Sequence, residues 1–435
     1  MRKIKLLIFL LLLPYFLYAT TVKELRLKNG LTLLFYEKSN APVVDVRLFY
    51  DVGSYIEKDG QKGLSHLFEH MMFRGSENYG DEEHSQLIQA VGGTVNAYTT
   101  DDMTVYYQKL PADQLELVLE LEADRMENLI INESILEKEK EVVKEEYRWR
   151  YQNNPQGKMF MEARKLLFPS HNYELGAIGT LEDVSAANVD DCKAFHKKYY
   201  APNNAVLVIV GDLNYRQVKR LVKKHFSTIA YQEIIKPETE ILPSYEAYQE
   251  YAVVTEFPTL ISTFSFVLPR AGTELKDKIA LDMISFALAS GDTSRLYKKV
   301  VTDEGLGVSV FEYIIDNKLG ALLMIGISHQ SQELDKIKYS FWQSLDSIKA
   351  NGLSEREFEK IKNRFLYLSR IEQFSASSLA DQIGRSYLYT GKKDSYFEQF
   401  KRLESISNED IIEVANRYLN KSQARYILFK PEKKL

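Results

Sequence analysis

The sequence predicts an α+β fold of two structurally similar α/β halves, each a mostly antiparallel sheet packed with helices and duplicated within the chain. Strand and helix patterns alternate along most of the 435 residues, a length sufficient for two or three domains. A polar connector with prolines and several glutamates, residues 231–250, interrupts this alternation, and the same order of elements restarts after it. We therefore expect an N-terminal domain over residues 20–230, a linker over 231–250 and a homologous C-terminal domain over 251–435.

A repeat at an offset of 222 residues also indicates a duplication. The sequence LEDVS at 181–185 is echoed by LESIS at 403–407. The same offset places the charged segment 131–146 on the charged segment 353–368. Together with the repeated order of elements, these matches favour two similar halves.

Each element of the first half has a local signal. A β-hairpin is expected over 22–36, because Lys28-Asn29-Gly30 is typical of a tight turn. Residues 64–73 are apolar nearly all round, which predicts a buried helix. Residues 94–110 contain Val, Tyr and Thr at a density typical of strands. The other strands of this half are expected over 43–52 and 205–210, and its other helices over 111–128, 132–150 and 216–226. In the second half we expect a strand over 260–268 and helices over 277–288 and 353–369.

The N-terminal segment has the pattern of a secretory signal peptide. A basic start (2–5) precedes an apolar run (6–17), and Ala19 offers a small residue for cleavage. We expect residues 1–19 to be removed after Ala19 and the mature protein to be periplasmic, without a stable membrane span. An uncleaved membrane anchor is the alternative, although the run is short for a bilayer and contains Pro14.

Composition narrows the class of protein. The chain is 45% hydrophobic and 27% charged, which is typical of a soluble globular protein. Its formal net charge is −5 and it has no basic block, which weighs against a nucleic-acid partner. Cys192 is the single cysteine, so no intramolecular disulfide can form. A bacterial periplasm fits this cysteine usage better than a disulfide-rich extracellular setting.

The segment His66-Leu67-Phe68-Glu69-His70 is the most informative motif. Two histidines four residues apart lie on the same side of a helix, one turn apart, which is the reach that two ligands of one zinc ion need. Glu69 projects near that side and is placed to take a proton from water. The order H-x-x-E-H is the inverzincin signature. It predicts a zinc metalloendopeptidase with His66 and His70 as metal ligands and Glu69 as the catalytic base; two core histidines are the alternative.

A catalytic zinc ion usually has a third protein ligand, and helix phase selects the candidates. One stripe of the helix predicted over 132–150 contains Ile135, Glu139, Val142, Glu146 and Trp149. Three of the five are apolar, so we expect this stripe, with Glu139 and Glu146, to face the core. Two inward carboxylates are unfavourable unless a cation meets them. That cation is Zn²⁺ in our interpretation, and Lys or Arg at a helix interface is the alternative. At the 222-residue offset both positions hold apolar residues, Ile361 and Leu368.

With these motifs the chain resembles the insulinase/pitrilysin family of zinc metallopeptidases. It most resembles the branch of half-length subunits that includes mitochondrial processing peptidase and bacterial periplasmic relatives. The resemblance covers essentially the whole mature chain and is carried by residues 63–75, 92–99, 139–146 and Gly211-Asp212. Glu146 also lies 76 residues beyond His70, which is the spacing of the family's third ligand.

The resemblance implies a role for each matching residue. His66, His70 and Glu146 would hold Zn²⁺, and Glu139 would support a ligand from behind. The segment 92–107 would be the edge strand that binds peptide substrates, with Asn96 and Ala97 beside the cleaved bond. A plain turn residue is the alternative for Asn96.

One departure from the family concerns the second half. Family members usually carry an Arg and a Tyr seven residues apart there, and the corresponding positions are Val301 and Val308. Valine has no hydrogen-bond donor on its side chain. We therefore expect a homologous zinc-less subunit to supply Arg and Tyr, giving a clam-like heterodimer that cleaves peptides or unfolded segments of exported proteins. A homodimer, and a non-catalytic or weakly active binding or assembly subunit, are the alternatives.

Overall fold

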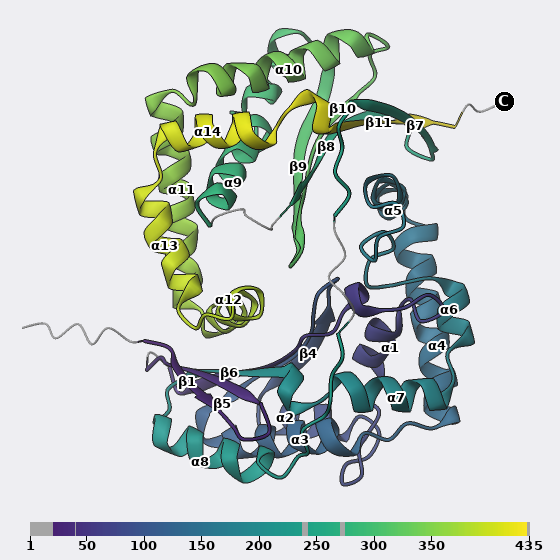
Figure 1. Ribbon diagram of the computed structural model, residues 1–435, viewed down its shortest axis with the longest axis vertical. Coiled ribbons are helices and arrows are strands. Elements are labelled where there is room, and N and C mark those ends of the chain that lie inside the picture. Colours follow the sequence, from purple (N-terminus) through teal and green to yellow (C-terminus); the bar gives the residue numbers. More distant parts are fainter. Residues whose placement is uncertain (1–20, 40, 237–241, 270–274, 433–435) are drawn as a thin grey trace, which may run out of the picture.

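The computed structural model describes residues 21–39, 41–236, 242–269 and 275–432 (Figure 1). The signal peptide predicted over residues 1–19 lies outside these ranges. Among the described residues, no helix is both long enough and apolar enough to cross a bilayer.

The first half is built on a six-stranded sheet with the spatial order β1-β2-β6-β3-β5-β4. Neighbouring strands are antiparallel except β2 and β6, which run parallel. The strands are β1 (Lys23–Arg26), β2 (Thr32–Glu37), β3 (Val43–Tyr50), β4 (Thr94–Thr99), β5 (Thr104–Pro111) and β6 (Ala205–Gly211). β4 is an edge strand, and β5 is its strand partner among the described residues.

The second half repeats this topology in a five-stranded sheet with the order β7-β11-β8-β10-β9. Here β7 and β11 are parallel and the other pairs antiparallel, so the sheet matches the first one without β1. The strands are β7 (Gln249–Thr255), β8 (Leu260–Pro269), β9 (Gly307–Asp316), β10 (Gly320–His329) and β11 (Ala424–Pro431). The predicted fold class, two similar α/β halves with mostly antiparallel sheets, is confirmed.

Helices pack on both sheets in a corresponding order. The first half contains α1 (Leu64–Met71), α2 (Glu83–Ala90), α3 (Leu115–Asn128), α4 (Glu133–Tyr147), α5 (Pro155–Leu167), α6 (Leu181–Ala186), α7 (Val189–Tyr199) and α8 (Tyr215–Phe226). The second half contains α9 (Leu275–Ala289), α10 (Leu334–Asn351), α11 (Glu355–Phe374), α12 (Ala376–Thr390), α13 (Ser395–Ser405) and α14 (Asn408–Tyr418). Two π-helical turns, η3 (Arg148–Gln152) and η5 (Tyr297–Asp303), follow α4 and α9.

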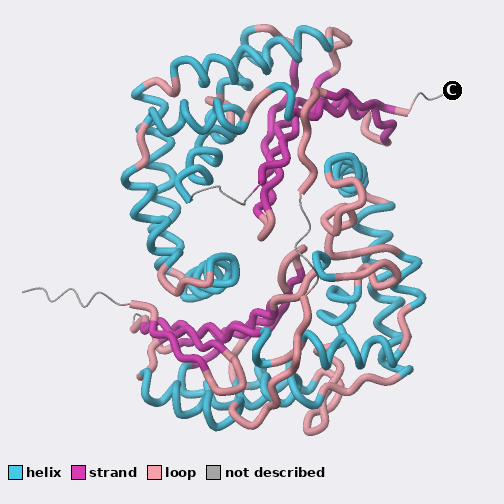
Figure 2. Tube along the Cα trace, viewed as in Figure 1, coloured by secondary structure: helices cyan, strands magenta, loops and turns pink. Residues whose placement is uncertain are grey.

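The two halves exchange one helix each (Figures 1 and 2). Helix α12 of the second half covers one face of the first sheet, with Leu379 and Ile383 packed in the same buried cluster as Phe49 and Val208. Helix α5 of the first half covers one face of the second sheet, in the cluster that contains Phe429. Each sheet therefore buries one of its faces against a helix from the other half.

Polar contacts between the two halves also form at the edge strand β4. Tyr98 donates a hydrogen bond to Asp381 of α12 (2.6 Å), which also accepts one from Arg47 (2.8 Å). Arg385 of α12 lies over the Tyr98 ring, 5.2 Å from its centroid. The first sheet is thus held at β4 by the second half of the chain.

Three sequence-based details are corrected. Residue Pro111 ends β5 instead of starting a helix, because its ψ of 141° is extended, and α3 begins at Leu115. The predicted helix over 132–150 ends at Tyr147 and continues as the π-helical turn η3. The LEDVS and LESIS segments are not equivalent, because Ser185 lies inside α6 whereas Ser407 is the N-cap of α14.

The 222-residue offset nevertheless relates α4 to α11. Their N-cap residues, Asn132 and Ser354, correspond at that offset, and each side chain accepts a hydrogen bond from a backbone N–H of the first turn. Ile361, the counterpart of Glu139, is buried, whereas Leu368, the counterpart of Glu146, is 40% exposed. The second half therefore replaces the inward carboxylate at 139 with core hydrocarbon.

Candidate metal centre

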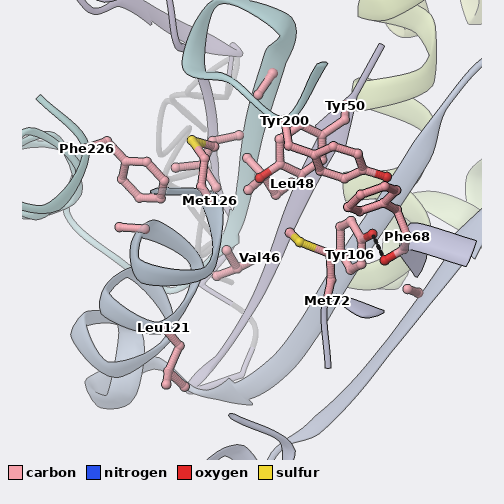
Figure 3. Close-up of a cluster of buried hydrophobic side chains, with 14 of the residues drawn as sticks. Val46, Leu48, Tyr50, Phe68, Met72, Tyr106, Leu121, Met126, Tyr200 and Phe226 are labelled. Carbon is pink, nitrogen blue, oxygen red and sulfur yellow. Dashed lines mark hydrogen bonds between the residues drawn. The ribbon is translucent and has the colours of Figure 1, made fainter. Parts of the chain in front are cut away.

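Helix α1 carries the H-x-x-E-H motif and is anchored from its apolar side. Phe68 is fully buried and packs against Tyr200 and Phe195, with ring centroids 5.2 and 5.4 Å away. Its backbone O accepts a hydrogen bond from the Tyr106 hydroxyl of β5 (3.1 Å), drawn in Figure 3. These contacts turn the opposite side of α1, with His66, Glu69 and His70, toward α4 and β4.

A buried carboxylate caps the start of α1. Glu57 is 1% exposed and accepts hydrogen bonds from the backbone N–H groups of Gly63 and Ser65, both at 2.7 Å. Gly63 has a φ of 100° and no side chain to serve as a cap, so Glu57, six residues earlier in the chain, fills that role. Burial raises the pKa of Glu57 to about 7, although the two backbone hydrogen bonds act in the opposite direction.

We expect the Glu57→Gln variant to change the pH dependence of stability. An acid whose folded-state pKa lies above its unfolded value contributes stability at low pH and loses it as the pH rises between the two values. Relative to the variant, the parent should lose about 3 kcal/mol of unfolding free energy as the pH rises from about 4.5 to about 7. Urea titrations at several pH values measure this; a Glu57→Gln difference as flat with pH as that of the exposed control Asp59→Asn contradicts it.

His66, His70 and Glu146 converge from α1 and α4. Nε2 of His66 lies 3.5 Å and Nε2 of His70 lies 3.3 Å from the same oxygen, Oε2 of Glu146. One donor atom from each of the three side chains lies within 4.8 Å of the others. In a tetrahedral zinc site with bonds of ~2.1 Å, neighbouring donor atoms are ~3.4 Å apart. The separations fit such a site, and so does the chemistry of two imidazoles and a carboxylate.

The electrostatics of the cluster also suit a cation. Burial lowers the pKa of His66 to about 4, with the His70 charge acting in the same direction, so the His66 imidazole is neutral as a metal ligand must be. Burial alone would lower the pKa of His70, but Glu139 and Glu146 raise it to about 9. Two carboxylates facing one imidazole thus favour positive charge between them.

Glu139 lies behind His70. It is fully buried, and its Oε2 lies 3.5 Å from Nδ1 of His70 while its Oε1 lies 2.7 Å from Nε of Arg74. This leaves Nε2 of His70 facing Glu146. A carboxylate on the far nitrogen of a histidine ligand fixes the orientation and tautomer of the ring. Both carboxylates selected by helix phase therefore contact histidines of the motif.

Glu69 is held by the edge strand. Its Oε2 accepts a hydrogen bond from Oγ1 of Thr99, the last residue of β4, at 2.6 Å. Burial raises the pKa of Glu69, and the Thr99 hydrogen bond and the His70 charge oppose the rise. A cavity of about 420 Å³ opens beside Glu69 and His70 and is also lined by Phe73 and Asn96. The base therefore faces a space that a substrate could enter.

The two residues expected beside the cleaved bond differ in exposure. Asn96 is exposed at the cavity, whereas Ala97 is 8% exposed and points into the core. The Oδ1 atom of Asn96 accepts a hydrogen bond from the Ala97 N–H at 2.8 Å. Both lie on β4, and among the described residues no strand pairs with β4 on the side away from β5. Asn96 is therefore a strand residue and not a turn residue.

The predicted inward stripe of α4 was only partly right. Val142 is 40% and Trp149 is 71% exposed, whereas Leu136 and Val143 are buried. The core-facing line of α4 is thus displaced by about one residue, and the two carboxylates lie on its flank toward α1. Trp149 also follows the end of the regular helix, where η3 changes the phase.

Sequence reasoning missed the residues that contact the motif from other segments. Arg74 lies three residues beyond the end of α1, where helix periodicity gives no signal for its contact with Glu139. Thr99 and Glu57 reach α1 from a strand end and a loop, which no periodicity links to the motif. Arg150, on η3, contacts Glu146 and was not singled out either.

The second half offers no comparable centre among its described residues. A cavity of about 700 Å³ lies between α9, α11, α12 and α13 and is lined in part by Leu368, the counterpart of Glu146. Within the described part of the chain, His66, His70 and Glu146 form the one cluster of His, Cys, Asp or Glu side chains close enough together to hold a metal ion. Val301 lies on η5, and Val308 on β9 is 56% exposed.

Comparisons with known proteins identify the family that this chain resembles. A family described as "Insulinase (Peptidase family M16)" matches residues 33–175, and one described as "Peptidase M16 inactive domain" matches residues 186–365. "Zinc protease PqqE" of Helicobacter pylori is 27% identical over 95% of this chain and 94% of its own length. "Uncharacterized zinc protease YmxG" of Bacillus subtilis is 24% identical over 93% of this chain and 97% of its own.

Solved structures show the same fold. A protease from Helicobacter pylori has a TM-score of 0.87 and 26% identity, covering 95% of this chain and 100% of that one. Pitrilysin has a TM-score of 0.75 and 18% identity, covering 95% of this chain and 45% of that one. The chain therefore spans about half the length of pitrilysin and nearly the full length of the Helicobacter pylori protease.

Proposed function

Because the chain belongs to the insulinase family, peptidase family M16, whose named relatives include zinc proteases, we propose that it is a zinc-dependent endopeptidase. The observation that carries this proposal is the approach of His66, His70 and Glu146 to one another with Glu69 beside them at a cavity. Zinc, His66, His70 and Glu146 form the metal site in this proposal, and Glu69 is the catalytic base.

The proposed mechanism assigns one task to each side chain. Zinc, when bound, supplies Lewis acidity toward a peptide carbonyl and toward water. Glu69 takes a proton from the attacking water and passes it to the leaving amine, and Thr99 holds the oxygen of Glu69 that faces β4. Glu139 keeps the His70 ring oriented toward Glu146.

Extended peptides are the proposed substrates. β4 is an edge strand that runs from Thr94 to Thr99 beside the cavity, with Asn96 exposed on it. An extended segment can add to such an edge through main-chain hydrogen bonds, with little demand on its side chains. Unfolded segments of exported proteins fit this mode, and the signal-peptide pattern of residues 1–19 supports a periplasmic location.

A second, homologous subunit is the proposed partner. Val301 and Val308 stand where the family usually has its Arg and Tyr, and neither can donate a hydrogen bond. The length match to half of pitrilysin supports a two-subunit assembly, in which this chain bears the zinc and the partner supplies Arg and Tyr. The alternative function, a non-catalytic or weakly active assembly subunit, is favoured by the same two valines.

Metal removal and subunit pairing test the proposal together. The purified protein is dialysed against a chelator, reloaded with zinc, and incubated with an unstructured peptide whose fragments are read by mass spectrometry. We expect one zinc per chain, slow cleavage by the isolated chain, and much faster cleavage with the homologous subunit. A folded protein that binds no zinc overturns the proposal. Zinc binding without cleavage in either form supports the alternative, and full turnover by the chain alone removes the partner.

A further inference from the structure

Arg150 occupies the far side of a proposed zinc ligand. Oε2 of Glu146 faces the two histidines, and its other oxygen, Oε1, lies 2.5 Å from Nη2 of Arg150. The guanidinium is thus one carboxylate away from the point on which the three donor side chains converge. The Arg150 side chain is 51% exposed, so solvent and a bound molecule can reach it.

The backbone that carries Arg150 is fixed by close packing. Arg150 lies in the π-helical turn η3, a type of turn that often occurs at functional sites. A Cβ atom on Gly157 of α5 would lie 1.9 Å from the backbone O of Arg150, so the chain can approach only because residue 157 is glycine. The side chain of Asn154 caps the same turn of α5 by accepting from the Gln156 and Gly157 N–H groups.

The ion pair with Glu146 leaves part of the hydrogen-bonding capacity of the Arg150 guanidinium unused. A guanidinium has five N–H donors in a planar fork. Glu146 is the one ion-pair partner of Arg150 within the described part of the chain, so donors remain for a molecule that enters the site.

We propose that Arg150 is a catalytic residue that donates a hydrogen bond to the carbonyl oxygen of the peptide bond under attack. Negative charge develops on that oxygen as water adds, and a donor already in place stabilises it more than it stabilises the substrate. Val301 and Val308 cannot provide such a donor. The inference rests on the proposed peptidase function and gives the metal-bearing half a cation of its own.

The simpler account of Arg150 is an ordinary i,i+4 ion pair with Glu146. Exposed pairs of this kind contribute little to stability and nothing specific to a reaction. The chain contains a matched control on the same turn. Arg148 forms an i,i+3 ion pair with Glu145, which is 70% exposed and contacts neither histidine of the motif in the described structure. Arg148→Ala removes the same charge from the same turn without touching Glu146.

The test compares two probes on zinc-loaded protein. One is the peptide whose cleavage site the experiment above maps, measured in the Glu69→Gln background so that it is not hydrolysed. The other is its phosphinic analogue, whose anionic tetrahedral group resembles the charge of the transition state. For Arg150→Ala we expect the affinity for the phosphinic analogue to fall about tenfold or more, with the affinity for the plain peptide and the zinc content unchanged. Arg150→Lys should recover part of the loss.

Three results overturn the inference. If Arg150→Ala and Arg148→Ala behave alike toward the phosphinic analogue, Arg150 is only an ion-pair partner. If Arg150→Ala weakens zinc binding in a metal titration, it acts through Glu146 and is a positioning residue. If it weakens both probes equally, it binds substrate without favouring the transition state. A parent protein that cleaves no peptide, alone or with its partner, instead overturns the proposed function before any substitution at position 150 is made.

Discussion

Glu69→Gln should abolish peptide cleavage while leaving zinc binding intact. The amide has nearly the shape of the carboxylate and can still accept the Thr99 hydrogen bond, but it cannot take a proton from water. A general base typically contributes about 10²–10⁴-fold to the rate, so cleavage should fall by that factor in whichever form, chain alone or pair, is active. Fragment analysis by mass spectrometry and metal analysis of the same sample measure both properties.

Glu77→Gln is the control for this substitution. Glu77 is exposed in the loop after α1, so its amide should leave both cleavage and zinc content unchanged. Cleavage that survives Glu69→Gln at the parent rate shows that another group is the base. Loss of zinc in Glu69→Gln would instead mean that Glu69 is itself a ligand.

Glu146→Gln should have the second large effect, a loss of zinc affinity. The substitution removes the negative charge and leaves a neutral amide oxygen, which is a weak ligand for zinc. Replacing an outer partner of a metal ligand typically lowers affinity by about 10–100-fold. We expect Glu139→Gln to fall within that range and Glu146→Gln to exceed it, as measured by calorimetric zinc titration.

The melting temperature gives an independent measure of whether Glu146 binds zinc. Zinc that binds only the folded chain raises its melting temperature, and the shift should disappear in Glu146→Gln. The neighbour Glu145 is 70% exposed and pairs with Arg148, so Glu145→Gln should keep the shift of the parent. Equal zinc affinities for Glu145→Gln and Glu146→Gln would remove Glu146 from the site.

The spacing of residues within single helices predicted much of the candidate site. The pair His66 and His70 follows from the period of the helix, and the same reasoning on α4 selected Glu139 and Glu146. It also placed Trp149 in the core, where the structure leaves it 71% exposed. A one-dimensional pattern gives the angle between residues of one helix but not which side of the helix meets its neighbours.

Long-range contacts were out of reach of the sequence. The hydrogen bond from Thr99 to Glu69 joins residues 30 positions apart that share no helix or strand period. The exchange of α5 and α12 could not be predicted either, since each helix has an apolar side that fits either sheet. The repeated element order predicted two halves, and only tertiary packing decides which half covers which.

The exchange of α5 and α12 means that the second half also stabilises the edge strand at which we propose that peptides bind. Through Asp381 and Arg385 it grips Tyr98, two residues along β4 from Asn96, so the stiffness of the strand proposed to hold a peptide is set from the other end of the chain. A copy that loses its metal ligands after a gene duplication therefore stays under selection for these contacts. Substitutions in α12, far from the proposed metal ligands, should therefore affect the half that carries the H-x-x-E-H motif, and the sequences of the two halves are expected to change together.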